Sequence, residues 1–470
     1  MNPTWGSVTV AEIAEVCGGS VVRGDGLGPV SGVSTDSRSL RPGELFFALA
    51  GPTFDGHLFA GKALMAEASG VVVRRGRASS INQEGTVVAV DDPLAALGSI
   101  ARWWRARHPV TVAAITGSAG KTTTKEMAAL VFETLGPTLK TEGNFNNLIG
   151  VPLTLLRIQP NHAFAVVEMG MNRPGEIAAL TEMAVPNLGL ITNVGMAHLE
   201  GLGGVTGVAR AKWELAEGLN SGSTLIINGD DSELMRRAAE SRKEVITFGV
   251  GESNRFRAIE IENLGVEGVR FLMAYCGETH AVKLQAAGIH QVMNALAAAA
   301  LGVTAGASPE KAAGALERFS PLEGRFFVHR VSGSFTLVDD SYNANPSSLK
   351  AALRSAAALA GKNSRLLVGL GTMAELGDAT AEAHRDAGRL VAASGAARFW
   401  AMGLHASGMV EGAEQGGMPA EDMEISDSHE AVALRIRETA QPGDVVFIKG
   451  SRSAEMERVV AVLKETAVSG

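Results

Sequence analysis

Short apolar runs alternate with amphipathic stretches along nearly the whole chain. The apolar runs predict strands, because burial on both faces is typical of parallel sheets. The stretches between them repeat apolar residues at helical spacing and predict helices. Predicted strands lie at 21–22, 45–49, 71–73, 87–90, 110–115, 164–167, 188–192, 224–228, 244–248, 335–340, 365–370, 398–402, 422–426 and 444–448, and predicted helices at 8–17, 56–68, 93–107, 121–135, 205–218, 291–302, 309–319, 347–360, 379–393, 429–439 and 454–464. This alternation indicates an α/β fold.

The order of these elements divides the chain into three regions. A chain of 470 residues is too long for one core, so several domains are expected. We predict a small α/β domain at 1–108, a central parallel sheet at 109–321 and a C-terminal doubly wound, Rossmann-like domain at 322–470. Runs at 255–263, 267–275 and 279–285 predict an antiparallel meander added to the central sheet. The boundary at His108-Pro109 and the segment 321–324 are predicted hinges.

The stretch after the strand at 110–115 carries the strongest chemical signal. Gly117 and Gly120 allow a tight loop whose backbone N–H groups converge on an anion, and the next helix directs its N-terminus at the same place. Lys121 adds a positive charge for phosphates, and Thr122 offers a hydroxyl to magnesium. The standard phosphate-loop pattern would need glycine where this chain has Ile115. An ordinary strand–helix turn is the alternative, but it gives no reason for the lysine. The central region is therefore predicted to be P-loop ATPase-like.

Polar residues follow two neighbouring strands of the same predicted sheet. Glu168 ends one strand, where it is placed to bind the magnesium of a triphosphate. Asn193 follows the other and leads to His198. A lone histidine is more often a structural hydrogen-bonding residue, but its place after a strand of this sheet favours a functional role. Lys212 lies on the next helix, where the ordinary alternative is a surface ion pair.

Composition and charge exclude several classes of protein. A net charge of −8 and a pI of about 5.8, without a long basic run, argue against nucleic acid as a partner. Cys17 and Cys276 give neither a disulfide framework nor metal-ligand spacing, which favours a reducing compartment. No signal peptide and no apolar run of membrane-spanning length are present. We therefore expect a cytoplasmic protein without membrane insertion. A monomer is the expected state, although nothing in these features determines it.

Motifs in all three regions resemble the Mur ligases, in the order of that family. They are TGSAGKTTTKE at 116–126, EGNFNN at 142–147, NVGMAHLE at 193–200, AKWE at 211–214, GIHQVMN at 288–294, GR at 324–325 and DDSYNANPSS at 339–348. The resemblance covers nearly the whole chain and implies ATP-dependent amide ligation in peptidoglycan precursor synthesis. DDSYNANP and KGSR at 449–452 are similar to the member that joins D-alanyl-D-alanine to UDP-N-acetylmuramoyl-tripeptide.

The resemblance also implies an acyl-phosphate mechanism with ATP and two magnesium ions. Lys121, Glu168, His198 and Lys212 are the implied catalytic residues. Thr122 and Glu168 would hold the first metal, and His198 and a carbamylated Lys212 the second. Trp213 departs from the family pattern, where glycine is expected, and this puts the packing around Lys212 in question.

The remaining implied site residues divide by ligand. ATP is assigned Gly117, Ser118, Ala119, Gly120, Lys121, Thr122, Thr123, Asn294, Arg325, Asp340, Tyr342 and Asn343. The UDP-linked precursor is assigned Ser34, Thr35, Asp36, Ser37 and Arg38, its peptide end Asn144, Asn146 and Asn147, and the dipeptide carboxylate or the phosphates Lys449 and Arg452. Asn294 and Arg325 could equally be a helix cap and a surface charge.

Three other functions stay open at this point. A family member that adds the third amino acid, diaminopimelate or lysine, is the nearest, although its DNPR and KGHE motifs are absent. A P-loop NTPase switch would hydrolyse the nucleotide slowly without an amine substrate, and it leaves His198 and Lys212 without a role. A non-catalytic UDP-sugar-binding module explains least of the sequence.

Overall fold

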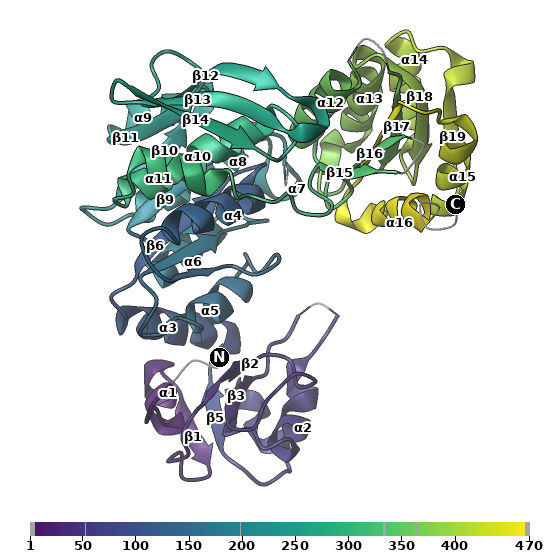
Figure 1. The fold of residues 1–470 in the computed structure, drawn as a ribbon. Helices are drawn as coiled ribbons and strands as arrows, with labels where there is room; N and C mark the ends of the chain where they lie inside the picture. The colour runs from purple at the N-terminus through teal and green to yellow at the C-terminus, as the bar shows by residue number, and fades with distance from the viewer. Residues whose placement is uncertain (1–4, 52, 198, 332–334, 362–363, 466–470) are drawn as a thin grey trace.

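The computed structural model describes residues 5–51, 53–197, 199–331, 335–361 and 364–465. These residues form three sheets of five, nine and six strands, each the centre of its own lobe (Figure 1). The middle lobe separates the first from the third in this view. The structure thus confirms the predicted three-part α/β architecture.

The first lobe is a five-stranded sheet in the order β1-β5-β4-β3-β2. Only β1 runs antiparallel to its neighbour. The elements are α1 Val10–Val16, β1 Ser20–Arg23, β2 Gly32–Ser34, β3 Glu44–Phe47, α2 Ala60–Met65, β4 Gly70–Arg74, β5 Val87–Val90 and α3 Pro93–Ala106, with 3₁₀ turns at Gly56–Phe59 and Arg75–Ser80. Asp92 caps α3 by accepting the Leu94 N–H, and Pro93 begins the helix.

The middle lobe has the strand order β14-β13-β12-β11-β10-β9-β6-β8-β7. Strands from β7 to β12 are parallel, and β12, β13 and β14 form the predicted antiparallel meander. The strands are β6 Thr111–Thr116, β7 Thr138–Lys140, β8 Phe164–Glu168, β9 Leu188–Ile191, β10 Thr224–Asn228, β11 Val245–Gly249, β12 Phe256–Asn263, β13 Val269–Tyr275 and β14 Glu278–Leu284. The helices are α4 Lys121–Phe132, α5 Gly150–Leu155, α6 Glu176–Ala184, α7 Leu199–Leu202, α8 Val205–Gly218, α9 Ser232–Ser241, α10 His290–Thr304 and α11 Pro309–Leu316.

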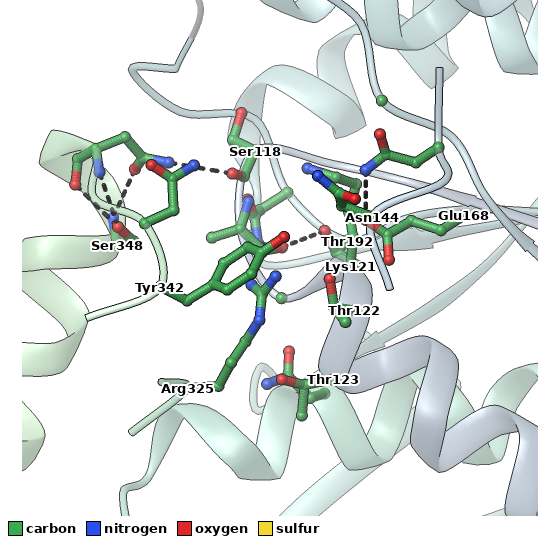
Figure 2. A pocket seen from close by; sticks show the side chains of 18 of the residues that line it. Ser118, Lys121, Thr122, Thr123, Asn144, Glu168, Thr192, Arg325, Tyr342 and Ser348 are labelled. Carbon is green, nitrogen blue, oxygen red and sulfur yellow. Dashed lines mark hydrogen bonds between the residues drawn. The ribbon is translucent and has the colours of Figure 1, made fainter. Parts of the chain in front are cut away.

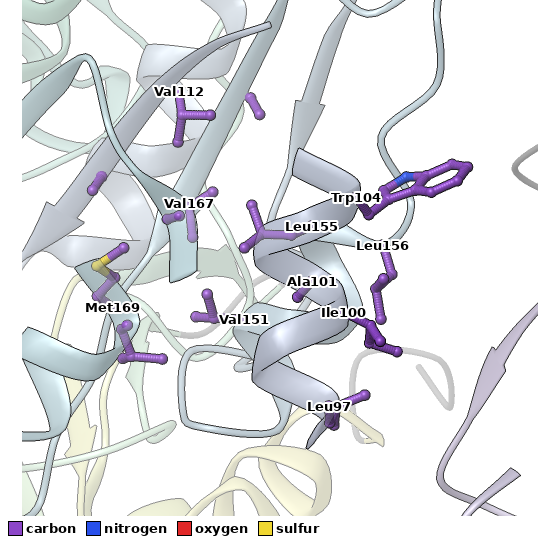
Figure 3. Close-up of a cluster of buried hydrophobic side chains, with 14 of the residues drawn as sticks. Leu97, Ile100, Ala101, Trp104, Val112, Val151, Leu155, Leu156, Val167 and Met169 are labelled. Carbon is purple, nitrogen blue, oxygen red and sulfur yellow. The ribbon is translucent and has the colours of Figure 1, made fainter. Parts of the chain in front are cut away.

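The helix α3 packs on the middle lobe although it follows the strands of the first. Leu97, Ile100 and Ala101 lie in one buried cluster with Val151 and Leu155 of α5 (Figure 3). The indole N–H of Trp104 donates to the Ile158 carbonyl at 3.0 Å, and the Trp104 ring stacks on Trp5 at 4.3 Å. The apolar stripe of α3 therefore joins the first two lobes. The boundary at residue 108 stays a prediction, and this packing favours counting α3 with the middle lobe.

The third lobe is a six-stranded sheet in the order β15-β16-β20-β17-β18-β19. Its strands are parallel except β15, as a doubly wound fold requires. The elements are β15 Phe327–Arg330, β16 Thr336–Asp340, α12 Pro346–Ala360, β17 Leu366–Gly371, α13 Thr380–Ala393, β18 Ala396–Met402, α14 Ala406–Gln415, β19 Met423–Ser426, α15 His429–Thr439, β20 Val445–Lys449 and α16 Glu457–Glu465. A search of the described ranges finds no helix long and apolar enough to span a bilayer.

Candidate active site

A cavity of about 730 Å³ lies where the middle and third lobes meet (Figure 2). Its walls come from the loop before α4, the ends of β8 and β9, the start of α10 and the ends of β16 and β20. Carboxyl ends of parallel strands from both sheets thus face one space, which is where α/β folds bind ligands. The lining includes Ser118, Ala119, Gly120, Lys121, Thr122, Thr123, Asn144, Asn146, Asn147, Glu168, Asn294, Arg325, Asp340, Tyr342, Asn343, Lys449 and Arg452.

Two glycines allow the loop before α4 to fold tightly against its neighbours. Gly117 has φ +152°, and a Cβ there would lie 1.8 Å from the Thr192 hydroxyl. Gly120 has φ +80°, and a Cβ there would lie 2.3 Å from Asn294 Oδ1. Gly120 is also the N-cap of α4 and supplies no side-chain cap. The first-turn N–H groups of α4 are therefore available to an anion.

Asn193 holds this loop from the end of β9. Its side-chain oxygen accepts the Ala119 N–H at 2.9 Å, and its amide nitrogen donates to the Ala119 carbonyl at 3.1 Å. The Ser118 hydroxyl in turn accepts the Gly195 N–H at 2.9 Å. The loop conformation therefore depends on the residues that follow β9.

Lys121 and Glu168 are the charged groups at the base of the cavity. The Lys121 ammonium donates to the Gly117 carbonyl at 2.7 Å. Burial lowers its pKa, while the charge of Glu168 opposes that shift. Glu168 is buried; its Oε1 accepts the Asn146 amide at 2.8 Å, and its Oε2 has no protein partner among the described residues. A buried carboxylate oxygen without a protein partner is suited to bind a cation.

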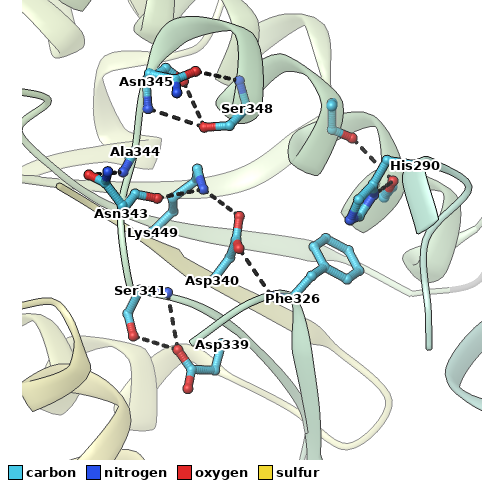
Figure 4. Close-up of polar contacts among 12 residues, drawn as sticks. His290, Phe326, Asp339, Asp340, Ser341, Asn343, Ala344, Asn345, Ser348 and Lys449 are labelled. Atoms are coloured by element: carbon cyan, nitrogen blue, oxygen red, sulfur yellow. Dashed lines mark hydrogen bonds and ion pairs between the residues drawn. The ribbon is translucent and has the colours of Figure 1, made fainter. Parts of the chain in front are cut away.

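The third lobe contributes an aromatic and charged wall. The Arg325 guanidinium lies 4.1 Å from the centre of the Tyr342 ring. Asp340 is held by Lys449, whose Nζ lies 2.5 Å from Asp340 Oδ2 and also donates to the Asn343 carbonyl at 2.9 Å (Figure 4). Burial raises the pKa of Asp340, and the charge of Lys449 opposes this. Lys449, predicted to meet the dipeptide carboxylate or the phosphates, is thus in an ion pair within its own lobe.

Hydrogen bonds fasten the start of α12 to the middle lobe. Asn345 caps α12 by accepting the Ser348 N–H at 2.8 Å, and its amide nitrogen donates to the Ser118 carbonyl at 3.3 Å. The Ser347 hydroxyl accepts the Met196 N–H at 3.0 Å. The third lobe therefore contacts both the loop before α4 and the segment after β9. Sequence reasoning assigned no role to Asn345 or Ser347. An asparagine before proline with a serine three residues later indicates a capping box, so the cap at Asn345 could have been predicted.

Lys212 is buried on α8 and is not part of the cavity lining. Burial and the charge of Lys121 hold the pKa of Lys212 well below its ordinary value. Trp213, the departure from the family motif, is buried in the cluster that joins the first two lobes. His198, predicted to hold a second metal, lies outside the described residues.

Several of the remaining predicted residues have local partners. Asn147 accepts the N–H groups of Ile149 and Gly150 at the start of α5, and Arg452 pairs with Glu457 at 2.5 Å. Ser34 to Arg38 lie in the first lobe and are not part of the cavity lining. There the Arg38 guanidinium lowers the pKa of Asp36 to about 2. Their assignments to substrates stay predictions.

Comparison with known proteins decides the family. Residues 29–105 match the model "Mur ligase family, catalytic domain", 115–302 "Mur ligase middle domain" and 324–452 "Mur ligase, glutamate ligase domain". The chain belongs to the Mur ligase family. This Mur ligase is 35% identical over 461 residues to the UDP-N-acetylmuramoyl-tripeptide–D-alanyl-D-alanine ligase of Escherichia coli K12, covering 98% of the chain and 99% of the relative.

Other relatives agree in sequence and in fold. The enzyme of the same name from Bacillus subtilis 168 is 35% identical over 464 residues, which cover 98% of this chain and 99% of the relative. A crystal structure of MurF from Acinetobacter baumannii superposes with a TM-score of 0.87 at 32% identity, covering 97% and 98%. A MurF ligase from Thermotoga maritima, crystallised with ADP, superposes with a TM-score of 0.82 at 26% identity, covering 93% and 98%.

Proposed function

We propose that this Mur ligase joins D-alanyl-D-alanine to UDP-N-acetylmuramoyl-tripeptide with cleavage of ATP to ADP and phosphate, in peptidoglycan precursor synthesis. The cavity between the middle and third lobes carries the proposal. It combines an uncapped helix N-terminus and Lys121, which suit phosphates, with the Arg325–Tyr342 wall, which suits a nucleoside. The relatives that match over the full chain carry this activity in their names.

ATP binding would follow the two halves of the cavity. Lys121 and the loop N–H groups would hold the β- and γ-phosphates, while Asn294, Arg325 and Tyr342 would contact the base and ribose. Binding of the triphosphate would stabilise the charged form of Lys121, whose pKa burial lowers. The ADP complex of the Thermotoga maritima relative supports a nucleotide in this family's fold.

The residues present fit a magnesium ion. Glu168 offers a buried oxygen without a protein partner, and Thr122 lies in the same cavity lining. Among the described residues no group of three or more histidine, cysteine, aspartate or glutamate side chains could hold a metal alone. This suits magnesium, which is usually bound by one or two carboxylates together with substrate phosphates. When bound, it would neutralise charge on the transferring phosphoryl group.

The reaction takes place in two steps. An oxygen of the tripeptide's terminal carboxylate attacks the γ-phosphorus of ATP. The bond between the γ-phosphorus and the bridging oxygen breaks, so that ADP leaves and an acyl phosphate forms. The dipeptide amine then attacks the acyl carbon, loses a proton, and inorganic phosphate leaves as the C–N bond forms. Lys121 and the loop N–H groups stabilise the phosphoryl oxygens in the first step, where positioning and charge neutralisation dominate catalysis.

Two finer assignments belong to the same proposal. The first lobe binds the uridine diphosphate through residues in 34–38. Lys212 would be carbamylated and, with His198, would hold a second magnesium. The low pKa of Lys212 supports this, because only the neutral amine reacts with CO₂. A carbamate resonance in ¹³C NMR spectra after addition of ¹³C-bicarbonate, absent from the Lys212→Ala variant, would test it.

Mass spectrometry of the product tests the main proposal. Enzyme with ATP, UDP-N-acetylmuramoyl-tripeptide and D-alanyl-D-alanine should give the pentapeptide and one phosphate per coupling. The same enzyme with UDP-N-acetylmuramoyl-dipeptide and diaminopimelate or lysine should give no tripeptide. Coupling of a single amino acid instead of the dipeptide, or phosphate release without any amine, would overturn the proposal.

A further inference from the structure

A second cavity, of about 240 Å³, opens beside the first at the junction of the same two lobes. It is lined by Asn172, Arg173, Glu200, Gly201 and Glu375. Asn172 and Glu375 line both cavities, so the two spaces share a wall. Ligand pockets for drug-sized molecules occupy roughly 300–1,000 Å³, so this smaller space suits a molecule of dipeptide size.

The walls of the second cavity follow the carboxyl ends of three parallel strands. Asn172 and Arg173 come after β8, Glu200 and Gly201 after β9, and Glu375 after β17 of the third lobe. These strand ends are the positions at which α/β sheets bind ligands. The cavity therefore exists only where the third lobe is docked on the middle lobe.

Close backbone contacts fix the walls. The Glu200 N–H donates to the Glu375 carbonyl at 3.3 Å across the lobe boundary. A Cβ on Gly201 would lie 2.1 Å from the Asn172 carbonyl oxygen, so no other residue fits there without movement. Glu375 has φ +62°, a backbone conformation that residues other than glycine rarely adopt. Such residues cluster at functional sites.

The charges match a zwitterion. One guanidinium and two carboxylates line this space, and a dipeptide carries one ammonium and one carboxylate, about 7 Å apart when it is extended. The shared wall sets the direction, because the amine must face the first cavity, where the acyl phosphate forms. Glu375 lies on that wall, whereas Arg173 lines only the second cavity.

We infer that this second cavity binds the incoming dipeptide, with Glu375 holding its ammonium group and Arg173 its terminal carboxylate. This inference rests on the proposed function. It assigns the preference for a dipeptide over a single amino acid to Arg173, because a single amino acid held at Glu375 would leave its carboxylate one residue short of the guanidinium. It also moves the dipeptide carboxylate away from Lys449, which is paired with Asp340.

Phosphate-release kinetics with two amine substrates test the inference. Wild-type enzyme should use D-alanyl-D-alaninamide, which lacks the carboxylate, with kcat/KM reduced about 10- to 100-fold, as expected for loss of a charge-assisted contact. Arg173→Ala should lose a similar factor with D-alanyl-D-alanine and no longer discriminate between the two. Glu375→Gln should raise the KM of both amines about tenfold.

The controls separate this result from general damage. Arg270→Ala removes an exposed arginine of β13 that pairs with Glu262, and it should behave as wild type. In the Arg173→Ala enzyme, the KM values for ATP and for the UDP-tripeptide should stay within about twofold of the wild-type values. An Arg173→Ala enzyme that still discriminates as wild type, or that loses affinity for the UDP-tripeptide instead, overturns the inference. Wild-type enzyme without any product from D-alanyl-D-alanine overturns the proposed function itself.

Discussion

Replacing Gly195 by alanine should weaken the docking of the third lobe on the loop before α4. A Cβ at this position would lie 2.3 Å from the Ser347 hydroxyl and 2.8 Å from the Ser347 Cβ. Carbon atoms in contact normally lie about 3.5–4.0 Å apart, so Ser347 must retreat by about 1 Å. Gly195 does not have a positive φ, so the backbone accepts alanine and the cost arises from this contact.

The size of the effect follows from two losses. Crowding of this kind costs about 1–3 kcal/mol, and the displaced Ser347 hydroxyl no longer accepts the Met196 N–H, which costs about 1 kcal/mol more. A total near 3 kcal/mol lowers the ratio of docked to undocked protein by about 100-fold. Because ATP would bridge the two lobes, its affinity should fall by about 10- to 100-fold, with every proposed contact to the nucleotide still in place.

Calorimetric titration with ADP and small-angle scattering would measure affinity and docking together. Gly314→Ala is the matched control, because no atom lies within 4 Å of its added Cβ. A second change, Ser347→Gly, removes the clashing atoms and should restore most of the affinity of Gly195→Ala. The reasoning is refuted if Gly195→Ala binds ADP and scatters as wild type, or if Ser347→Gly brings no recovery.

Three further predictions concern single groups of the cavity. Glu168→Gln should raise the magnesium concentration needed for half-maximal activity and lower kcat/KM about 100-fold; an unchanged magnesium titration would contradict its role. Lys121→Ala should lower kcat/KM for ATP by at least about 100-fold in phosphate-release assays, and coupling at the wild-type rate would refute the phosphate site. Burial and the charge of Lys449 lower the pKa of His290 from 6.5 to about 4. As the pH falls, His290 therefore becomes protonated in the unfolded chain at a higher pH than in the folded protein. Stability should therefore be lost between pH 6.5 and 4, by about 2 kcal/mol from pH 7 to pH 5, and urea unfolding of His290→Gln should lack this component.

Much of the fold could be predicted because local signals and tertiary packing agree. The helix α8 spans the predicted 205–218, and α11 begins at the predicted Pro309, after the N-cap Ser308. The helix α6 was missed because its cap is tertiary. Its N-cap residue Gly175 supplies no side-chain cap, and Glu214 of α8 accepts the N–H groups of Gly175 and Ala178 instead. No pattern near residue 175 reveals that partner.

The sequence analysis did not predict helix α9, for a different reason. Asp231 caps it by accepting the N–H groups of Glu233 and Leu234, a signal that the sequence does contain. Only Leu234 and Ala238 are buried, so the apolar stripe is narrow. Arginine and glutamate pairs three and four residues apart support the helix instead. A prediction based on apolar periodicity alone overlooks such a helix.

The site was predictable where it depends on strand ends and unpredictable where it depends on docking. The placement of Glu168 followed from its position at the end of β8. By contrast, the Asp340–Lys449 pair joins residues 109 apart, and the bond from Asn345 to Ser118 joins residues 227 apart. Sequence reasoning can place each residue at a strand end, but it cannot determine which groups neutralise each other across the sheet.

Docking of the third lobe links the two cavities energetically. The first cavity, where ATP is proposed to bind, and the second cavity share Asn172 and Glu375, and both have walls from the middle and third lobes. Separation of the lobes therefore removes the Arg325–Tyr342 wall and the Glu375 wall together. Gly195→Ala should raise the KM values of ATP and D-alanyl-D-alanine in parallel, whereas a calorimetric titration with UDP, which the first lobe is proposed to bind, should stay unchanged. A rise in the KM of ATP alone would show that the second cavity forms without docking, and would contradict the link.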